Sequence, residues 1–246
     1  MPMNLKKINN PFGGLTYYKE TTTSTMAEAM ELIEENRGEG SLFITDFQTE
    51  GKGRVPGRKW HTSENDNLTF TLVLKRDYIG HGFGTTPLRA GLALSKVINE
   101  LTGLESNVKW PNDVVVNDKK ISGILCRSHK GFILIGIGIN VNQLKFDDEI
   151  KNIATSLSLL TNNGFSLEMV LSKFLESFHK VLKSETWLDE LNEVLYRLGD
   201  SVSFLVGNPE SKNIVTGELV GLDEQGKVLI KDQNNTIHSY LSGEFI

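Results

Sequence analysis

Hydrophobic residues recur at helical spacing in several parts of the chain. The clearest stripe lies in segment 167–182, where the apolar side chains share one helical face: Leu167, Val170, Leu171, Phe174, Leu175, Phe178 and Leu182. Shorter stripes predict a helix over 87–103, closed by Gly103, and another over 187–198. Stripes of this kind are typical of helices that pack one face against a hydrophobic core.

A further helix is predicted near the N-terminal end of the chain. Thr25 and Glu28 have the spacing of a capping box, in which the two side chains satisfy backbone N–H groups at a helix start. Apolar residues then recur at helical spacing, and segment 37–40, with its two glycines, ends the helix.

Short apolar or alternating runs between the helices predict strands. In the first part of the chain they cover 42–45, 68–74, 108–110, 114–116, 121–126 and 132–141. After a Gly-Asp turn at 199–200 the runs become short and regularly spaced, at 201–206, 214–222, 227–230 and 236–241. The pattern predicts an α+β fold with two domains: a mixed sheet with packed helices over 1–198 and a small β-barrel over 199–246.

Composition narrows the class of protein. The chain has 246 residues and a formal net charge of −5, so it lacks the basic footprint of a nucleic-acid-binding domain. Cys126 is the one cysteine, and the five histidines are scattered without the spacing of metal ligands, so no dedicated metal site is expected. Neither a signal peptide nor an apolar run near the ~20 residues of a membrane span is present. We expect a soluble, cytoplasmic protein.

Against this acidic background, segment 51–60 concentrates four cations and three glycines before a tryptophan. Glycines let a backbone approach a ligand closely, and cations beside such a backbone suit a phosphate. Taken alone, the segment is equally compatible with a solvated turn.

A second cluster follows on predicted strands. Pro111 cannot donate a ladder hydrogen bond, so it interrupts the strand and exposes Asn112 and Asp113 side by side. Lys120 starts the next strand, with Gly123 clearing space opposite it. A plain turn and a surface lysine are the alternatives. Further on, segment 136–142 carries glycines inside an apolar strand, but it lacks the third glycine and the following helix of a dinucleotide-binding fingerprint.

Together these motifs resemble the biotin protein ligases. The resemblance follows the chain in order: Ser24-Thr25-Met26, Gln48, Gly51-Lys52-Gly53-Arg54 with Trp60, the run 109–113, Lys120 with Gly123, the run 136–140, and Gly243-Glu244 at the end. It departs from the family at two points. Lys52 stands where the family usually has arginine. Lysine keeps the positive charge but lacks the bidentate fork of a guanidinium. The basic loop is also one residue longer, with Val55-Pro56-Gly57 before Arg58.

The resemblance implies a biotin–lipoyl ligase fold, related to class II synthetases, with an SH3-like C-terminal barrel. It implies a carbon–nitrogen ligase that joins biotin to ATP as biotinyl-5′-AMP and then transfers biotin to a lysine of a biotin carboxyl carrier domain. Mg²⁺ is expected on the nucleotide phosphates. Catalysis is assigned to Lys120, Arg54 and Asp113. Biotin is placed against Ser24, Thr25, Met26, Gln48, Gly51, Lys52, Gly53, Arg54, Lys120, Gly123 and Gly136. ATP and the adenylate are placed against Arg54, Arg58, Trp60, Asn112, Lys120 and Asn140.

The early position of Ser24 implies a monofunctional member, without the N-terminal DNA-binding domain that some relatives carry, so neither DNA nor a membrane is an expected partner. Monomer and homodimer stay open. Two other functions also stay open: a lipoate or octanoate protein ligase of related fold, and a non-catalytic biotin-binding regulator. For Trp60, core packing is the alternative to a contact with adenine.

Overall fold

A computed structural model of the chain describes residues 3–35, 38–60, 66–79, 82–208 and 212–246. A seven-stranded sheet lies at its centre, in the order β1-β2-β3-β7-β6-β5-β4. β1 and β2 are parallel, and the other neighbours are antiparallel. The strands are β1 (Thr16–Thr22), β2 (Leu42–Gln48), β3 (Asn67–Lys75), β4 (Asn107–Lys109), β5 (Asp113–Val116), β6 (Lys119–His129) and β7 (Phe132–Asn140).

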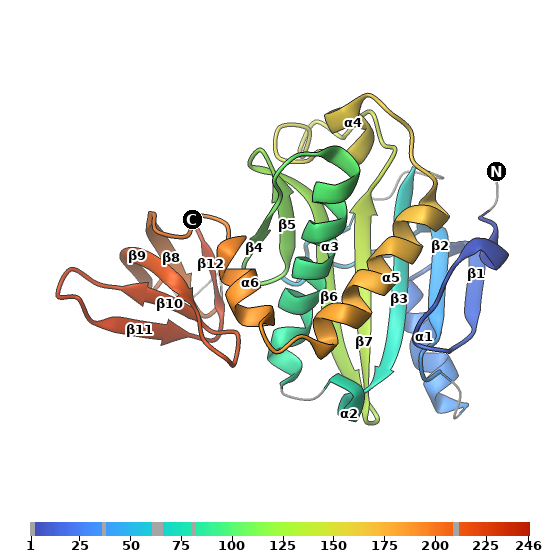
Figure 1. The fold of residues 1–246 in the computed structure, drawn as a ribbon, viewed down its shortest axis with the longest axis horizontal. Coiled ribbons are helices and arrows are strands. Elements are labelled where there is room, and N and C mark those ends of the chain that lie inside the picture. The colour runs from blue at the N-terminus through green and yellow to red at the C-terminus, as the bar shows by residue number, and fades with distance from the viewer. Residues whose placement is uncertain (1–2, 36–37, 61–65, 80–81, 209–211) are drawn as a thin grey trace.

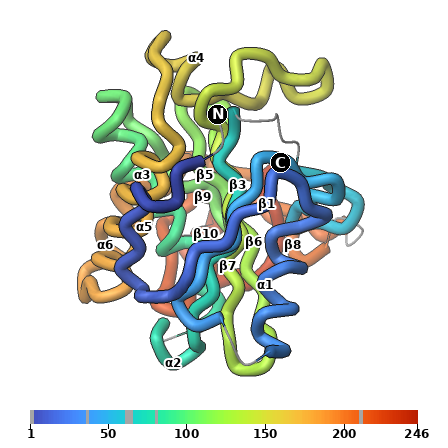
Figure 2. Tube along the Cα trace, turned by 90° about the vertical axis from the view of Figure 1, so that its right-hand side faces the viewer, coloured from blue at the N-terminus to red at the C-terminus, as the bar shows by residue number. Residues whose placement is uncertain are grey.

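The helices cover the two faces of this sheet unequally. α3 (Thr86–Thr102) and α5 (Leu167–Lys183) pack on one face, and α1 (Thr25–Glu34) packs on the other (Figures 1 and 2). The remaining helices are short: α2 (Arg76–Ile79), α4 (Leu157–Thr161), α6 (Trp187–Glu193) and 3-10 turns at Leu5–Lys7 and Phe83–Thr85. None of the described helices combines the length and the hydrophobicity that crossing a bilayer requires.

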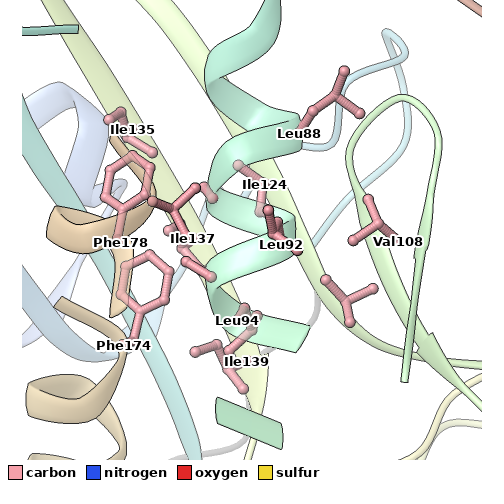
Figure 3. Close-up of a cluster of buried hydrophobic side chains, with 14 of the residues drawn as sticks. Leu88, Leu92, Leu94, Val108, Ile124, Ile135, Ile137, Ile139, Phe174 and Phe178 are labelled. Atoms are coloured by element: carbon pink, nitrogen blue, oxygen red, sulfur yellow. The ribbon is translucent and has the colours of Figure 1, made fainter. Parts of the chain in front are cut away.

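The core lies between the sheet and α3 with α5 (Figure 3). Alternate residues of β7, among them Ile135, Ile137 and Ile139, are buried in this core with Phe174 and Phe178 of α5. Because successive side chains of a strand point to opposite faces, the residues between these isoleucines face α1. Both of these residues, Gly136 and Gly138, are glycines and carry no side chain, which leaves space on the α1 face of the sheet.

The C-terminal part forms a five-stranded antiparallel sheet in the order β11-β10-β9-β8-β12, the SH3-like domain that was predicted. Its strands are β8 (Ser201–Val206), β9 (Ile214–Leu222), β10 (Val228–Lys231), β11 (Ile237–Tyr240) and β12 (Gly243–Phe245). Trp110 joins it to the first part: its indole N–H donates to the Gly226 carbonyl at 2.9 Å, and its ring packs on Phe204. One hydrophobic core therefore runs through both parts. The boundary between 198 and 199 stays a prediction.

The structure confirms the α+β class and the predicted strands, with corrections at two helices. The capping box is wrong: Ser24 is the N-cap of α1, the Thr25 hydroxyl bonds Gln48 instead, and Glu28 bonds Lys19. Residues 36–37, inside the segment predicted to end this helix, lie outside those described.

The helix predicted over 187–198 ends at Glu193. Beyond it, the Val194 carbonyl accepts from Val108 at 2.8 Å, so pairing with β4 takes this segment out of the helix. β1 had no counterpart in the sequence interpretation. It is an edge strand with mixed burial, so its threonines, tyrosines and charged residues show no clean alternation.

Candidate functional site

A cavity of about 350 Å³ opens on the α1 face of the sheet. Its walls come from the start of α1, the end of β2, segment 52–60, β3, the β4–β5 turn, β6, β7 and β12. All but two of the predicted site residues line it: Ser24, Thr25, Met26, Gln48, Lys52, Gly53, Arg54, Arg58, Trp60, Asn112, Asp113, Lys120, Gly123 and Gly136. Gly51 and Asn140 lie outside the lining.

A polar corner forms where α1 meets the sheet. The backbone N–H and the hydroxyl of Thr25 both donate to Oε1 of Gln48, at 2.8 and 3.1 Å. The same hydroxyl lies 2.9 Å from that of Thr71, which is fully buried. The Gln48 side chain therefore ties the start of α1 to the end of β2. Thr71 was not predicted as a site residue.

Segment 51–60 is itself a small hairpin. Lys52 pairs with Lys59 across it, Gly53 N–H donates to the Arg58 carbonyl at 2.8 Å, and Trp60 N–H donates to Gly51 at 3.1 Å. A Cβ on Gly51 would stand 2.6 Å from the Trp60 carbonyl oxygen. Gly51 therefore lets the two arms of the hairpin approach, and it is not part of the cavity lining.

Both arginines of the hairpin contact the last strand of the chain. Nη2 of Arg58 donates to Oε1 of Glu244 at 2.7 Å, and Nη2 of Arg54 donates to the Gly243 carbonyl at 3.2 Å. The hydrogen bond from Arg58 is the main cause that lowers the pKa of Glu244, and the same bond raises the pKa of Arg58. Glu244 lines the cavity and is a site residue that the prediction did not include.

The β4–β5 turn presents its two polar residues differently. Asn112 stabilises the turn through two hydrogen bonds to Ile124, both at 2.9 Å. Its side-chain amide donates to the Ile124 carbonyl, and its backbone carbonyl accepts from the Ile124 N–H. Asp113 faces the cavity and forms an ion pair with Lys120, with 2.7 Å between Oδ1 and Nζ. The Lys120 side chain is 38% exposed and that of Asp113 25%, so the pair is only partly shielded from water.

The position of Lys120 is fixed by its backbone. Its N–H donates to the Ile153 carbonyl at 2.7 Å and its carbonyl accepts from Thr155 at 2.9 Å. Asn140, which was expected to read adenine, is buried and donates to the Thr155 carbonyl at 3.0 Å. Asn140 thus braces the segment that holds Lys120.

Side chains fill the space above the glycines of β6 and β7. A Cβ on Gly136 would meet the Met26 methyl at 2.9 Å, and a Cβ on Gly138 would meet the Trp60 indole at 2.1 Å. A Cβ on Gly123 would lie 3.2 Å from side-chain atoms of both Lys120 and Trp60. The space over Gly123 and Gly136 that was predicted for biotin is therefore partly occupied by the side chains of Met26, Lys120 and Trp60. These three side chains can rotate to other rotamers.

Charge in the cavity is mixed but mostly positive. Lys52, Arg54, Arg58, Lys59, Lys109, Lys120 and Arg127 line it, against Glu50, Asp113 and Glu244. The polar corner at Thr25 lies at one end of the glycine floor and Lys120 at the other. This arrangement fits a ligand with a neutral polar head, an apolar middle and an anionic end. A second, phosphate-bearing ligand can meet that end, because fixed cations stabilise charge that develops between two anions.

Residues 18–143 match the biotin/lipoate A/B protein ligase family, and residues 207–246 match the biotin protein ligase C-terminal domain. The chain belongs to the biotin/lipoate A/B protein ligase family. The Bacillus subtilis bifunctional ligase/repressor BirA is 32% identical over 238 residues, covering 92% of this chain and 72% of that protein. The Mycobacterium tuberculosis biotin–[acetyl-CoA-carboxylase] ligase is 32% identical over 123 residues, covering 48% of this chain and 45% of that protein.

Solved structures of the family agree with this membership. The biotin protein ligase from Aquifex aeolicus in complex with biotin and ATP superposes with a TM-score of 0.82 and is 34% identical, covering 94% of this chain and 97% of that one. The Helicobacter pylori biotin acetyl coenzyme A carboxylase synthetase has a TM-score of 0.66 at 23% identity, covering 92% and 99%. This second likeness shows a shared fold.

Proposed function

We propose that this chain is an ATP-dependent biotin protein ligase. It joins biotin to ATP as biotinyl-5′-AMP, releases pyrophosphate, and transfers the biotinyl group to a lysine of a biotin carboxyl carrier domain. One observation carries the proposal: the Thr25–Gln48 corner and the Lys120–Asp113 pair line one cavity, within the residues that match the ligase family. The match to the biotin protein ligase C-terminal domain favours biotin over lipoate as the acid.

The first step brings the biotin carboxylate to the α-phosphate of ATP. These are like charges, so the step needs preorganised cations at the junction. Lys120 supplies an ammonium whose backbone is fixed on both sides by segment 153–155. Arg54 supplies a guanidinium at the hairpin, where Lys52 and Arg58 add further positive charge. The new bond joins the carboxylate oxygen to phosphorus, and the bond to pyrophosphate breaks.

The biotin head fits the polar corner. Ser24, Thr25 and Gln48 offer hydroxyl and amide groups to the ureido ring, while Met26 and Gly136 lie beside the apolar part. The nucleotide then lies toward Arg58 and Trp60, with Asn112 and Asn140 acting through the segments that they brace.

Mg²⁺ enters this proposal with the phosphates. It usually keeps several waters and binds one or two carboxylates together with substrate phosphates. Glu244, which lines the cavity, would supply such a carboxylate. Among the described residues there is no cluster of three or more histidine, cysteine or acidic side chains, so a separate protein-only metal cage is not part of the proposal.

The second step needs a neutral acceptor lysine at the acyl carbon. Asp113 orients that amine and takes its proton. The new carbon–nitrogen bond forms as the bond between the acyl carbon and the phosphate oxygen breaks, and AMP leaves. The hairpin 51–60 lies over the junction and limits the access of water to the mixed anhydride. We propose the ligase reaction alone for this chain, with no binding to operator DNA.

The test is pyrophosphate exchange into ATP with biotin, lipoate or octanoate as the acid, followed by transfer of labelled biotin to a carrier domain. We expect exchange and transfer with biotin only. Exchange with lipoate or octanoate instead would replace the proposal with the related ligase. Biotin binding without any exchange would support a non-catalytic regulator.

A further inference from the structure

Three buried polar atoms of the cavity lining form no hydrogen bond with the residues that the structure describes: the Thr69 hydroxyl, the Trp60 indole N–H and Oδ1 of Asp113. Oδ1 of Asp113 is ion-paired with Lys120, so the first two are the atoms without any partner. Thr69 is 3% exposed. Neighbouring hydroxyls are paired, since Thr25 bonds Gln48 and Thr71, and Ser122 donates to the Gly138 carbonyl at 2.7 Å. An unpaired buried polar group is unfavourable and uncommon. Two of them side by side therefore mark a place where a ligand completes the site.

The sheet register places both atoms at the same spot. Thr69 on β3 pairs with Gly138 on β7, which pairs with Gly123 on β6, which pairs with Asp113 on β5. These four residues form one row across the floor of the cavity. The Trp60 indole lies on this row, with Nε1 2.5 Å from where a Cβ of Gly138 would be. The indole thus covers the floor next to Thr69.

The next row on the same face holds the polar corner. Thr71 pairs with Gly136, and Thr71 contacts the Thr25 hydroxyl. Two residues along a strand span about 6.8 Å, which is the scale of a fused two-ring group. A bicyclic ligand with its urea edge at Thr25 and Gln48 therefore brings its opposite edge to Thr69. In biotin that opposite edge carries the thioether sulfur, a weak hydrogen-bond acceptor.

We propose that Thr69 is a specificity-determining residue of the biotin site, whose hydroxyl donates to the thioether sulfur once the Trp60 indole moves off Gly138. The inference rests on the proposed function, because it takes biotin as the ligand of the Thr25–Gln48 corner. It assigns Thr69 to biotin and not to ATP.

The first experiment measures binding of biotin, dethiobiotin and ATP, each alone, by calorimetry to the full chain and to Thr69→Val. Dethiobiotin keeps the urea and the carboxylate chain but lacks the sulfur. Losing one hydrogen bond should weaken biotin binding about two- to ten-fold and leave dethiobiotin and ATP unchanged. Equal biotin affinity in Thr69→Val, or an equal loss for dethiobiotin, would overturn the assignment. Failure of the unmodified chain to bind biotin would instead remove the proposed function.

A stability measurement separates this role from a structural one. Thr69→Val removes a hydroxyl that is unpaired in the protein alone, so the melting temperature without ligand should stay equal or rise. Thr71→Val is the matched comparison two residues away: it breaks a bond to Thr25 and should lower the melting temperature. A drop in Thr69→Val as large as that in Thr71→Val would show that the Thr69 hydroxyl already has a protein partner, and the proposal would fall.

Movement of the indole gives a third readout. Biotin should change the intrinsic fluorescence of the chain, and Trp60→Phe should abolish that change while Trp110 and Trp187 stay in place. An unmodified chain that binds biotin with no change in fluorescence would contradict the displacement on which access to Thr69 depends.

Discussion

Arg58 and Glu244 form an ion pair at 2.7 Å across 186 residues of chain, and this contact fastens the basic hairpin to the last strand. Arg54 reaches the same strand through the Gly243 carbonyl. The C-terminal domain therefore holds one wall of the cavity through the hairpin. It touches a second wall through Trp110, which lies three residues before Asp113 and bonds Gly226. The position of the small domain and the shape of the site are mechanically linked.

Replacing Glu244 by glutamine should lower stability in a pH-dependent way. The folded protein lowers the pKa of Glu244, chiefly through the bond from Arg58. A lowered pKa contributes stability that is fully present above the ordinary glutamate pKa of about 4.3 and is lost as pH falls through the folded value. Since Arg58 is 59% exposed and Glu244 27%, we expect about 0.2–1 kcal/mol at pH 7.

Urea unfolding of the unmodified chain and of Glu244→Gln, followed from pH 7 to pH 3, measures this effect. The two stabilities should converge as the medium becomes acidic. Arg58→Gln should reproduce the loss at pH 7, and the double variant should lose little more. A difference that is constant with pH, or fully additive losses, would show that the pair does not act as described.

Motifs close together in sequence predicted most of the cavity, because each motif carries its own local chemistry. The glycines of 51–60, the break at Pro111 and the glycine pair in β7 all lie where such residue types are needed. Glu244 and Thr69 show the limit. Glu244 reaches the site from a distant strand, and Thr69 becomes a site residue only through its register with Gly138. Neither strand pairing nor packing between domains can be read from a local pattern.

Asn140 shows a second limit, and its contact with adenine stays a prediction. Its motif was interpreted as a ligand contact, but the strand turns its amide toward the Thr155 carbonyl. A polar side chain at a strand end can serve the ligand or the neighbouring chain, and only the fold decides which.

Lys120→Ala should leave a folded protein that forms adenylate slowly. Removing one preorganised donor from a site of developing charge commonly lowers the rate about 10²–10³-fold. Pyrophosphate exchange measures the step directly. Lys119→Ala is the matched control, since Lys119 is exposed and lies outside the cavity lining. If Lys120→Ala exchanges pyrophosphate as fast as the unmodified chain, Lys120 has no part in the proposed first step.

Trp110→Phe should loosen the junction between the two parts of the chain. The substitution keeps a ring next to Phe204 but leaves the Gly226 carbonyl without its buried donor, at an expected loss of about 1–3 kcal/mol. Urea unfolding measures the loss. Tyr240→Phe offers a comparison, because it also alters a ring beside Phe204 but at a site away from the cavity. Equal stability of Trp110→Phe and the unmodified chain would show that the bond to Gly226 does not hold the junction.

Asp113→Asn should slow transfer of biotin to the carrier domain more than it slows adenylation. The variant keeps the size and hydrogen bonding of the side chain but removes the charge that takes a proton from the acceptor lysine, a contribution of about 10²-fold or more in general base catalysis. The ion pair with Lys120 is lost as well, so some effect on adenylation is expected. Supplying preformed biotinyl-5′-AMP isolates the second step.

Comparing the rates of the two steps shows which of them depends on Asp113. If Asp113→Asn transfers supplied adenylate at the normal rate but exchanges pyrophosphate slowly, the carboxylate serves Lys120 or the metal-bound phosphates, and the proposed base is wrong. Asp118→Asn controls for a nearby charge change, because Asp118 accepts from Tyr196 at 2.8 Å outside the cavity. A proton-transfer role also predicts that raising the pH restores transfer in Asp113→Asn, since a larger fraction of the acceptor lysine is then already neutral. A merely structural role for Asp113 would show no such recovery.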